Sequence, residues 1–153
     1  MKGSVLGIMH NTEALVRSEL ATARTANNQF QAAKSGRLAA TAAQDTADTN
    51  ATKFIVATRD VVKVRLGSRY SQAWDEAGFN SQSLAVPATI SQRMELRKSL
   101  ELYLAAHEAY AVPALNVTES QAAALHTALS DAVSALNAAR SEQRAKRQAV
   151  ERA

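Results

Sequence analysis

Apolar side chains recur along this chain at intervals of three and four residues, the spacing of one face of an α-helix. The pattern predicts a first long helix over residues 12–48, with Val16, Leu20, Ala23, Phe30 and Ala33 on its apolar face. Beyond Phe30 this face is almost entirely alanine. The narrow face predicts close packing against another helix.

The segment 51–66 allows two interpretations. Phe54, Val62 and Leu66 fit one helical face, whereas residues 62–66 alternate between apolar and charged side chains as a strand does. We favour a second helix, because a lone strand would have no partner in the chain and an unpaired strand edge is unfavourable.

Two further helices follow a long irregular stretch. A third is predicted over residues 90–111, where Thr89 can cap its start and Pro113 ends it. A fourth is predicted over residues 118–153, where Thr118 has a Gln three residues later, the spacing of a capping box.

These elements predict an all-α fold, an elongated antiparallel bundle of about four helices in one domain spanning residues 1–153. Residues 1–10 are expected to be a flexible lead-in and residues 67–88 a connector. The chain contains 33 Ala but five Gly and two Pro, so long helices with narrow seams are expected. Coiled-coil supercoiling is expected where the apolar spacing nears 3.5 residues.

The connector contains the only Trp of the chain. A short helix over residues 71–77, stopped by Gly78, is expected there. Tyr70, Trp74 and Phe79 would clamp the connector onto the bundle. A ligand cleft formed by these rings is the alternative.

Two parts of the chain match each other at an offset of 106 residues. Thr12-Glu13 corresponds to Thr118-Glu119, and residues 32–35 correspond to residues 138–141. Duplication of a helical hairpin and chance similarity between Ala-rich helices both remain open. A duplication would leave the second copy without its partner helix at residue 153, through truncation or because another subunit supplies it.

The connector, with residues 70–74 reading Tyr-Ser-Gln-Ala-Trp and residues 77–79 reading Ala-Gly-Phe, resembles that of a family of uncharacterised bacterial helical proteins. The lead-in, with Leu6-Gly7-Ile8, is also similar. The resemblance implies long Ala-rich helices joined by this connector. It implies no activity.

The residues that could carry chemistry do not form a recognisable set. There is no cysteine, no Glu-x-x-His and no phosphate-binding glycine loop. His107 lies on the apolar face of the third helix, where a structural histidine with one hydrogen bond is expected, and His126 is expected to face solvent. We therefore expect no catalytic residue, no metal and no cofactor.

Basic residues give the only indication of a binding surface. Arg140, Arg144 and Arg147 share a helical face, and a second basic group lies within residues 59–69 of a chain with net charge +4. The sequence predicts a non-enzymatic structural or assembly protein that self-associates or packs on a helical partner. The alternative is a module that binds nucleic acid or an anionic surface. No transmembrane segment is expected, and the sequence does not indicate a compartment.

Overall fold

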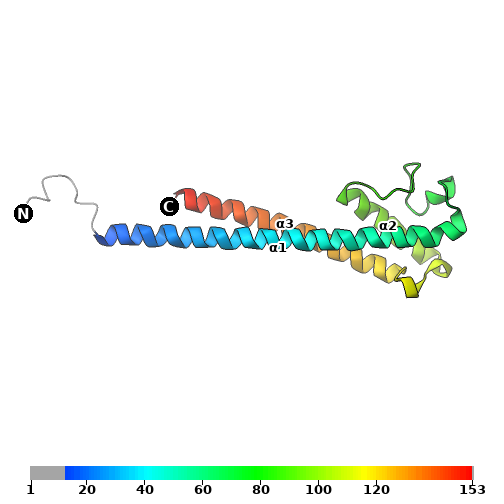
Figure 1. The fold of residues 1–153 in the computed structure, drawn as a ribbon, viewed down its shortest axis with the longest axis horizontal. Coiled ribbons are helices and arrows are strands. Elements are labelled where there is room, and N and C mark those ends of the chain that lie inside the picture. The colour runs from blue at the N-terminus through cyan, green and yellow to red at the C-terminus, as the bar shows by residue number, and fades with distance from the viewer. Residues whose placement is uncertain (1–12, 153) are drawn as a thin grey trace, which may run out of the picture. The chain divides into compact units, whose positions relative to one another are not determined.

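The computed structural model describes residues 13–152, which form helices and connecting loops (Figure 1). In chain order these are the helix α1 (Glu13–Leu66), the short 3₁₀ helix η3 (Gln72–Trp74), α2 (Ile90–Ala106), the 3₁₀ helices η4 (Glu108–Tyr110) and η5 (Pro113–Leu115), and α3 (Glu119–Arg152). Within residues 13–152 there is no strand, only an isolated antiparallel bridge between Val112 and Val117. The predicted all-α class is confirmed, and residues 51–66 are helical.

The prediction of four helices is wrong, because the first two form one helix. Residues 48–51 read Asp-Thr-Asn-Ala and contain neither Gly nor Pro, so the weak helix formers Thr49 and Asn50 lower helix stability without ending the helix. Ala51 is fully buried, which holds α1 in place just beyond them. Residues 51–66 thus continue α1 instead of turning back, and the predicted hairpin repeat is not supported.

The described residues divide into two compact units, and the single domain stays a prediction. Unit 1 consists of residues 13–41 and 135–152, and unit 2 consists of residues 42–134. The predicted lead-in over residues 1–10 and the predicted helix start at Thr12 lie outside the described residues.

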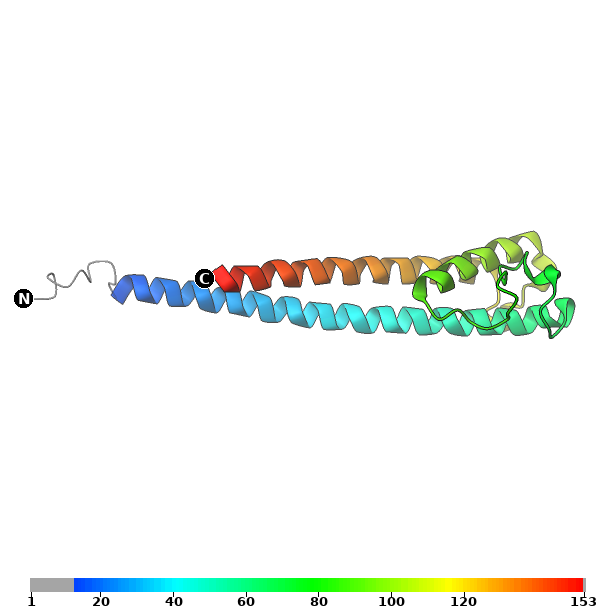
Figure 2. The same ribbon diagram turned by 90° about the horizontal axis from the view of Figure 1, so that it is seen from above.

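Unit 2 is built from three helices. Asp48 of α1 pairs with Arg93 of α2, and Arg65 near the end of α1 lies over the ring of Tyr110 beyond α2, so these two helices run in the same direction. In Figure 1, α2 lies above α1 and the first part of α3 below it, whereas the view of Figure 2 has both on one side of α1. The core contains Phe54, Ile55, Val62, Trp74, Ala77, Phe79, Leu96, Leu100, Tyr103, Leu104, Val117 and Ala122.

Local signals place three helix ends where the sequence predicts them: the starts of α2 and α3 and the end of α1. Thr89 caps α2 by accepting a hydrogen bond from the Gln92 backbone N–H, and Thr118 caps α3 in the same way. At the end of α1, Gly67 has a φ of +90° and its N–H donates to the Lys63 carbonyl at 2.9 Å. This is the left-handed conformation in which glycine commonly ends helices.

The predicted end of the third helix at Ala111 is wrong, since α2 ends at Ala106. In a continuous helix Tyr110 would lie about 10 Å along the axis from Tyr103. Instead the chain leaves the helix at His107, whose φ is −130°, and the two tyrosine rings pack with their centroids 5.9 Å apart.

The connector is more tightly turned than the predicted helix over residues 71–77. Only residues 72–74 are helical, as the 3₁₀ helix η3, and the Trp74 carbonyl then accepts from the backbone N–H groups of both Ala77 and Phe79. Gly78 lies between these donors with a φ of +94°. The shorter helix accompanies burial of both the Trp74 and the Phe79 rings.

Candidate functional site

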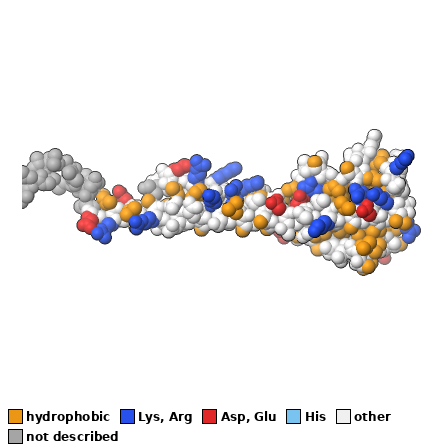
Figure 3. Space-filling model, viewed as in Figure 1, with side chains coloured by type: hydrophobic (Ala, Val, Ile, Leu, Met, Phe, Trp, Pro, Cys, Tyr) orange, Lys and Arg blue, Asp and Glu red, His pale blue; other side chains and the backbone are white. Residues whose placement is uncertain are grey.

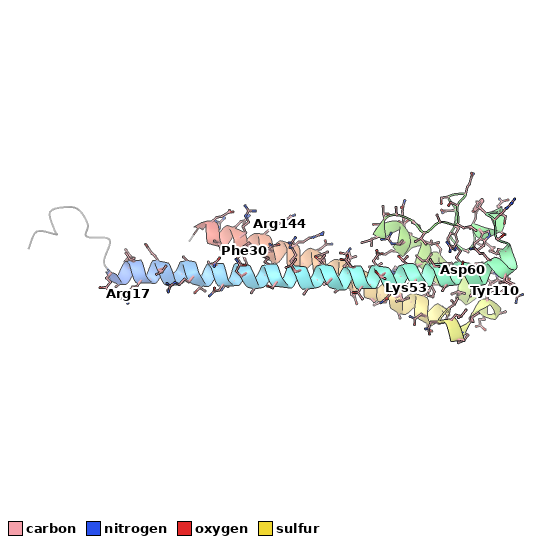
Figure 4. All side chains as sticks on the ribbon, viewed as in Figure 1. Arg17, Phe30, Lys53, Asp60, Tyr110 and Arg144 are labelled. Atoms are coloured by element: carbon pink, nitrogen blue, oxygen red, sulfur yellow. The ribbon has the colours of Figure 1, made fainter. Side chains whose placement is uncertain are left out.

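The two helix segments of unit 1 meet along a narrow seam. On α1 the less exposed positions are spaced by three and four residues, and on α3 the spacing is the same. The α1 positions are Ala23, Ala26, Phe30, Ala33, Arg37 and Ala40, and the α3 positions are Leu136, Ala139, Gln143, Lys146 and Val150. Lys146 Nζ donates to Gln29 Oε1 at 3.1 Å beside the seam. Figure 4 shows Phe30 on the side of α1 toward α3.

This seam buries little apolar surface. Among the described residues of unit 1 only Ala33 and Leu136 are buried, at 6% and 3% exposure. Large apolar side chains remain exposed, namely Val16 at 51%, Leu20 at 48% and Leu38 at 55%. Because helices in proteins draw most of their stability from packing of an apolar face, unit 1 gains little from its own seam.

A second stripe on α1 lies beside the seam, and we call it the small-residue stripe. Its members are exposed and uncharged, and they are again spaced by three and four residues: Ser18, Thr22, Thr25, Gln29, Ala32, Gly36 and Ala39. The Thr22 and Thr25 hydroxyls donate to backbone carbonyls four residues earlier, at 3.0 and 2.9 Å. Their hydrogen-bonding capacity is thereby partly used within the helix.

The surface along this stripe is hollowed. Part of it forms a shallow depression of about 420 Å³, lined by Ser18, Ala21, Thr22, Thr25, Ala26 and Gln29. Gly36, farther along, has no atom of another residue within 4 Å of the position that a Cβ would take. Small side chains of this kind allow another helix to approach closely.

The predicted basic residues lie on the surface of unit 1. Arg140, Arg144 and Arg147 are all exposed, and Arg147 pairs with Glu151 at 2.9 Å. Figure 3 shows Lys and Arg side chains gathered over the last turns of α3, and in Figure 4 Arg144 points outward. The described residues of unit 1 carry nine Lys or Arg and four Asp or Glu, whereas unit 2 carries eight and ten.

The connector aromatics belong to unit 2. Trp74 is fully buried and Phe79 is 2% exposed, with their rings edge to face at 5.4 Å between centroids. Tyr70 is half-buried against the same core, and its hydroxyl donates to Asp75 Oδ1 at 2.5 Å. The Trp74 indole N–H is buried without a hydrogen-bond partner.

A stack of three rings joins the end of α2 to the chain beyond it. His107 lies between Tyr103 and Tyr110, with ring centroids 4.3 and 5.1 Å away, and its Nδ1 lies 2.9 Å from the Tyr103 carbonyl oxygen. The Arg65 guanidinium lies 5.2 Å from the Tyr110 ring centroid. His107 is therefore a partly buried histidine with one hydrogen bond, as predicted. His126 does not simply face solvent, since it is half-buried and its Nδ1 has no partner.

Burial raises the pKa of the Tyr103 phenol above its ordinary value, with smaller contributions from Tyr110 and Glu76. The unfolded chain releases this proton first, so stability is complete below about pH 10 and falls as the pH rises further. Above about pH 10 this group lowers the free energy of unfolding by up to ~1.4 kcal/mol per pH unit. We expect replacement of Tyr103 by Phe to abolish that contribution, because Phe has no proton to release. Chemical denaturation between pH 8 and roughly pH 11 measures it. Equal slopes for wild type and Tyr103→Phe would contradict the prediction.

A charged cluster between α1 and α2 was not predicted. Arg93 binds both carboxylate oxygens of Asp48, at 2.8 and 2.5 Å, and its Nη1 donates to the Pro87 carbonyl at 2.7 Å. One turn later, Arg97 is fully buried and none of its three guanidinium nitrogens has a hydrogen-bond partner. The sequence contained one sign of this cluster: Arg97 directly follows Leu96, which belongs to the apolar pattern of the third predicted helix.

The remaining hollows offer few reactive groups. A groove of about 330 Å³ lies between the connector and α2, and Glu95 is the single ionisable residue among those that line it. Within residues 13–152, no three His, Cys, Asp or Glu side chains are grouped so that they could hold a metal ion. No helix in this part of the chain has an apolar stretch long enough to cross a membrane.

Comparisons of the chain with protein-family models, with curated protein sequences and with solved structures found no significant match. The resemblance of the connector to a bacterial helical family therefore stays a prediction.

Proposed function

We propose that this is a non-enzymatic structural or assembly protein whose long helices associate side by side, with the small-residue stripe of unit 1 as the contact surface. The observation that carries the proposal is the sparse seam of unit 1, in which only Ala33 and Leu136 are buried among the described residues. A helix pair with so little buried apolar surface gains stability when a further helix covers it.

A second copy of this chain is the occupant that we propose for the stripe. The stripe itself is uncharged and its side chains are small apart from Gln29, which accepts a hydrogen bond from Lys146, so the same stripe on another copy can approach it without burying an unpaired charge. A contact between identical stripes is self-complementary and closes as a dimer with two-fold symmetry. The three-and-four spacing of both stripe and seam would allow coiled-coil packing in this assembly.

The charges of unit 1 predict how such a dimer responds to salt. Both copies carry an excess of basic residues over acidic ones, so their repulsion opposes association and is screened as ionic strength rises. Association through the uncharged stripe should therefore strengthen with salt.

Sedimentation velocity of the whole chain tests this proposal. Replacing both Ala32 and Ala39 with Glu is expected to weaken association at least about tenfold, since burying unpaired carboxylates at the contact costs about 1.4 kcal/mol or more. Asn27→Glu is the control, because Asn27 is exposed and lies five residues from Ala32, more than a third of a turn away around α1. Circular dichroism checks that all variants stay helical.

Two results would contradict the proposal: a wild-type chain that remains monomeric over the whole concentration range, or equal association of wild type and the double variant.

Unit 1 carries nine basic and four acidic described residues, and this positive charge favours a second candidate function. That function is binding to nucleic acid or an anionic surface through Arg140, Arg144 and Arg147. A monomer that binds a DNA duplex, and loses affinity as salt rises, would favour that candidate over assembly.

A further inference from the structure

The Arg97 side chain on α2 presents an unusual electrostatic situation inside unit 2. It is 0% exposed, and its Nε, Nη1 and Nη2 atoms are all buried without a hydrogen-bond partner. A guanidinium does not lose its proton in proteins, so it cannot escape burial by becoming neutral. A buried charge of this kind is strongly destabilising unless an opposite charge compensates for it.

The two nearest acidic side chains are already engaged by other cations. Asp48 and Glu101 both raise the pKa of Arg97, although burial is the larger effect and lowers it. Both oxygens of Asp48, however, are bound by Arg93. Glu101 is bound by Lys98, with 2.7 Å between Nζ and Oε1.

The cluster therefore holds three cations and two carboxylates. Arg93, Arg97 and Glu101 follow one another at intervals of four residues and so share one face of α2, with Arg97 in the middle. The Arg93 and Asp48 side chains are 12% and 22% exposed, so solvent screens this pair weakly, whereas Lys98, at 51% exposure, faces solvent. The charge at the most buried position, that of Arg97, is left without a direct hydrogen bond or ion pair.

We propose that Arg97 binds a small inorganic anion, of the size of chloride, in the interior of unit 2. Water could accept hydrogen bonds from the three nitrogens but would leave the positive charge uncompensated. An anion would accept those hydrogen bonds and also compensate the charge. Arg97 lines none of the hollows described above, and chloride is among the smallest anions that would compensate its charge. This site is independent of the association surface, which lies in unit 1.

The binding is tested directly by the ³⁵Cl NMR line width of chloride in the presence of the whole chain. The wild type is expected to broaden the line, and Arg97→Met, which fills a similar volume without charge, is expected to lose the broadening. Arg69→Met is the matched control, because Arg69 belongs to the same unit and is exposed. It should behave as the wild type does.

Thermal unfolding provides the second measurement, at constant ionic strength with chloride replaced by the larger gluconate. Chloride at ~100 times its dissociation constant raises the folding equilibrium constant of the wild type about 100-fold, and the melting temperature rises accordingly. Arg97→Met should show no chloride dependence, and in gluconate it should melt above the wild type. A wild type that melts identically in both salts, or an Arg97→Met variant that keeps the chloride effect, would overturn the proposal.

Discussion

Replacing Trp74 with alanine is expected to lower the free energy of unfolding by about 3–5 kcal/mol, the largest effect of any single substitution considered for this protein. Trp74 is fully buried and its ring packs edge to face against Phe79. The side chains around a removed core ring relax only partly, so most of its space would stay unfilled. The η3 turn would lose the side chain that anchors it to the core.

Chemical denaturation followed by circular dichroism measures this change, since the substitution removes the only Trp and with it the fluorescence signal. Trp74→Phe is the matched control. It keeps an aromatic ring and removes an indole N–H that has no hydrogen-bond partner, so its loss should be well below that of Trp74→Ala. A loss below about 1 kcal/mol for Trp74→Ala would show that the connector does not depend on this ring.

Replacing Gly78 with alanine is expected to destabilise unit 2 by about 2–5 kcal/mol, for two separable reasons. The φ of +94° is strained for any residue with a Cβ atom. A Cβ at this position would also lie 2.5 Å from Ser99 Cβ and 3.2 Å from Leu96 Cδ1 on α2. The connector would have to move away from α2 to relieve this overlap.

Gly67→Ala separates the two contributions, because Gly67 has a similar φ of +90° but no atom within 4 Å of its Cβ position. Gly67→Ala should lower the free energy of unfolding by only about 1–2 kcal/mol, the contribution from the strained backbone conformation. Adding Ser99→Gly to Gly78→Ala should recover part of the loss, and a double-mutant cycle measures that coupling by denaturation. Equal losses for Gly67→Ala and Gly78→Ala would contradict the predicted close contact with α2.

Local signals in the sequence were sufficient for the all-α class and for the starts of α2 and α3. Thr89 and Thr118 cap their helices as predicted, because a hydroxyl that binds a backbone N–H three residues later needs no help from distant parts of the chain. The apolar spacing correctly predicted helix for residues 51–66. Two predictions about where a helix breaks were wrong. The break expected near residues 49–50 is absent, and the break at His107 was not expected. Both depend on what packs nearby.

The charged cluster and the contact surface were beyond sequence reasoning for a similar reason. Whether Arg97 is buried depends on the helices that cover α2. A sequence pattern indicates on which face of α2 Arg97 lies, but not how completely other helices cover that face. The exposed basic residues Arg140, Arg144 and Arg147 could be placed because they share a simple helical face. The small-residue stripe of α1 was not singled out, since alanine and threonine occur on the seam and the stripe alike.

The composition of unit 1 from the two ends of the described chain constrains the order in which the molecule folds. Residues 13–41 and 135–152 are joined through the whole of residues 42–134, so their pairing closes a very long loop while that intervening chain is disordered. When residues 42–134 fold first, that loop is no longer disordered, and pairing of the two segments then costs less conformational entropy. During synthesis residues 13–41 therefore have no partner segment until residues 135–152 begin to leave the ribosome.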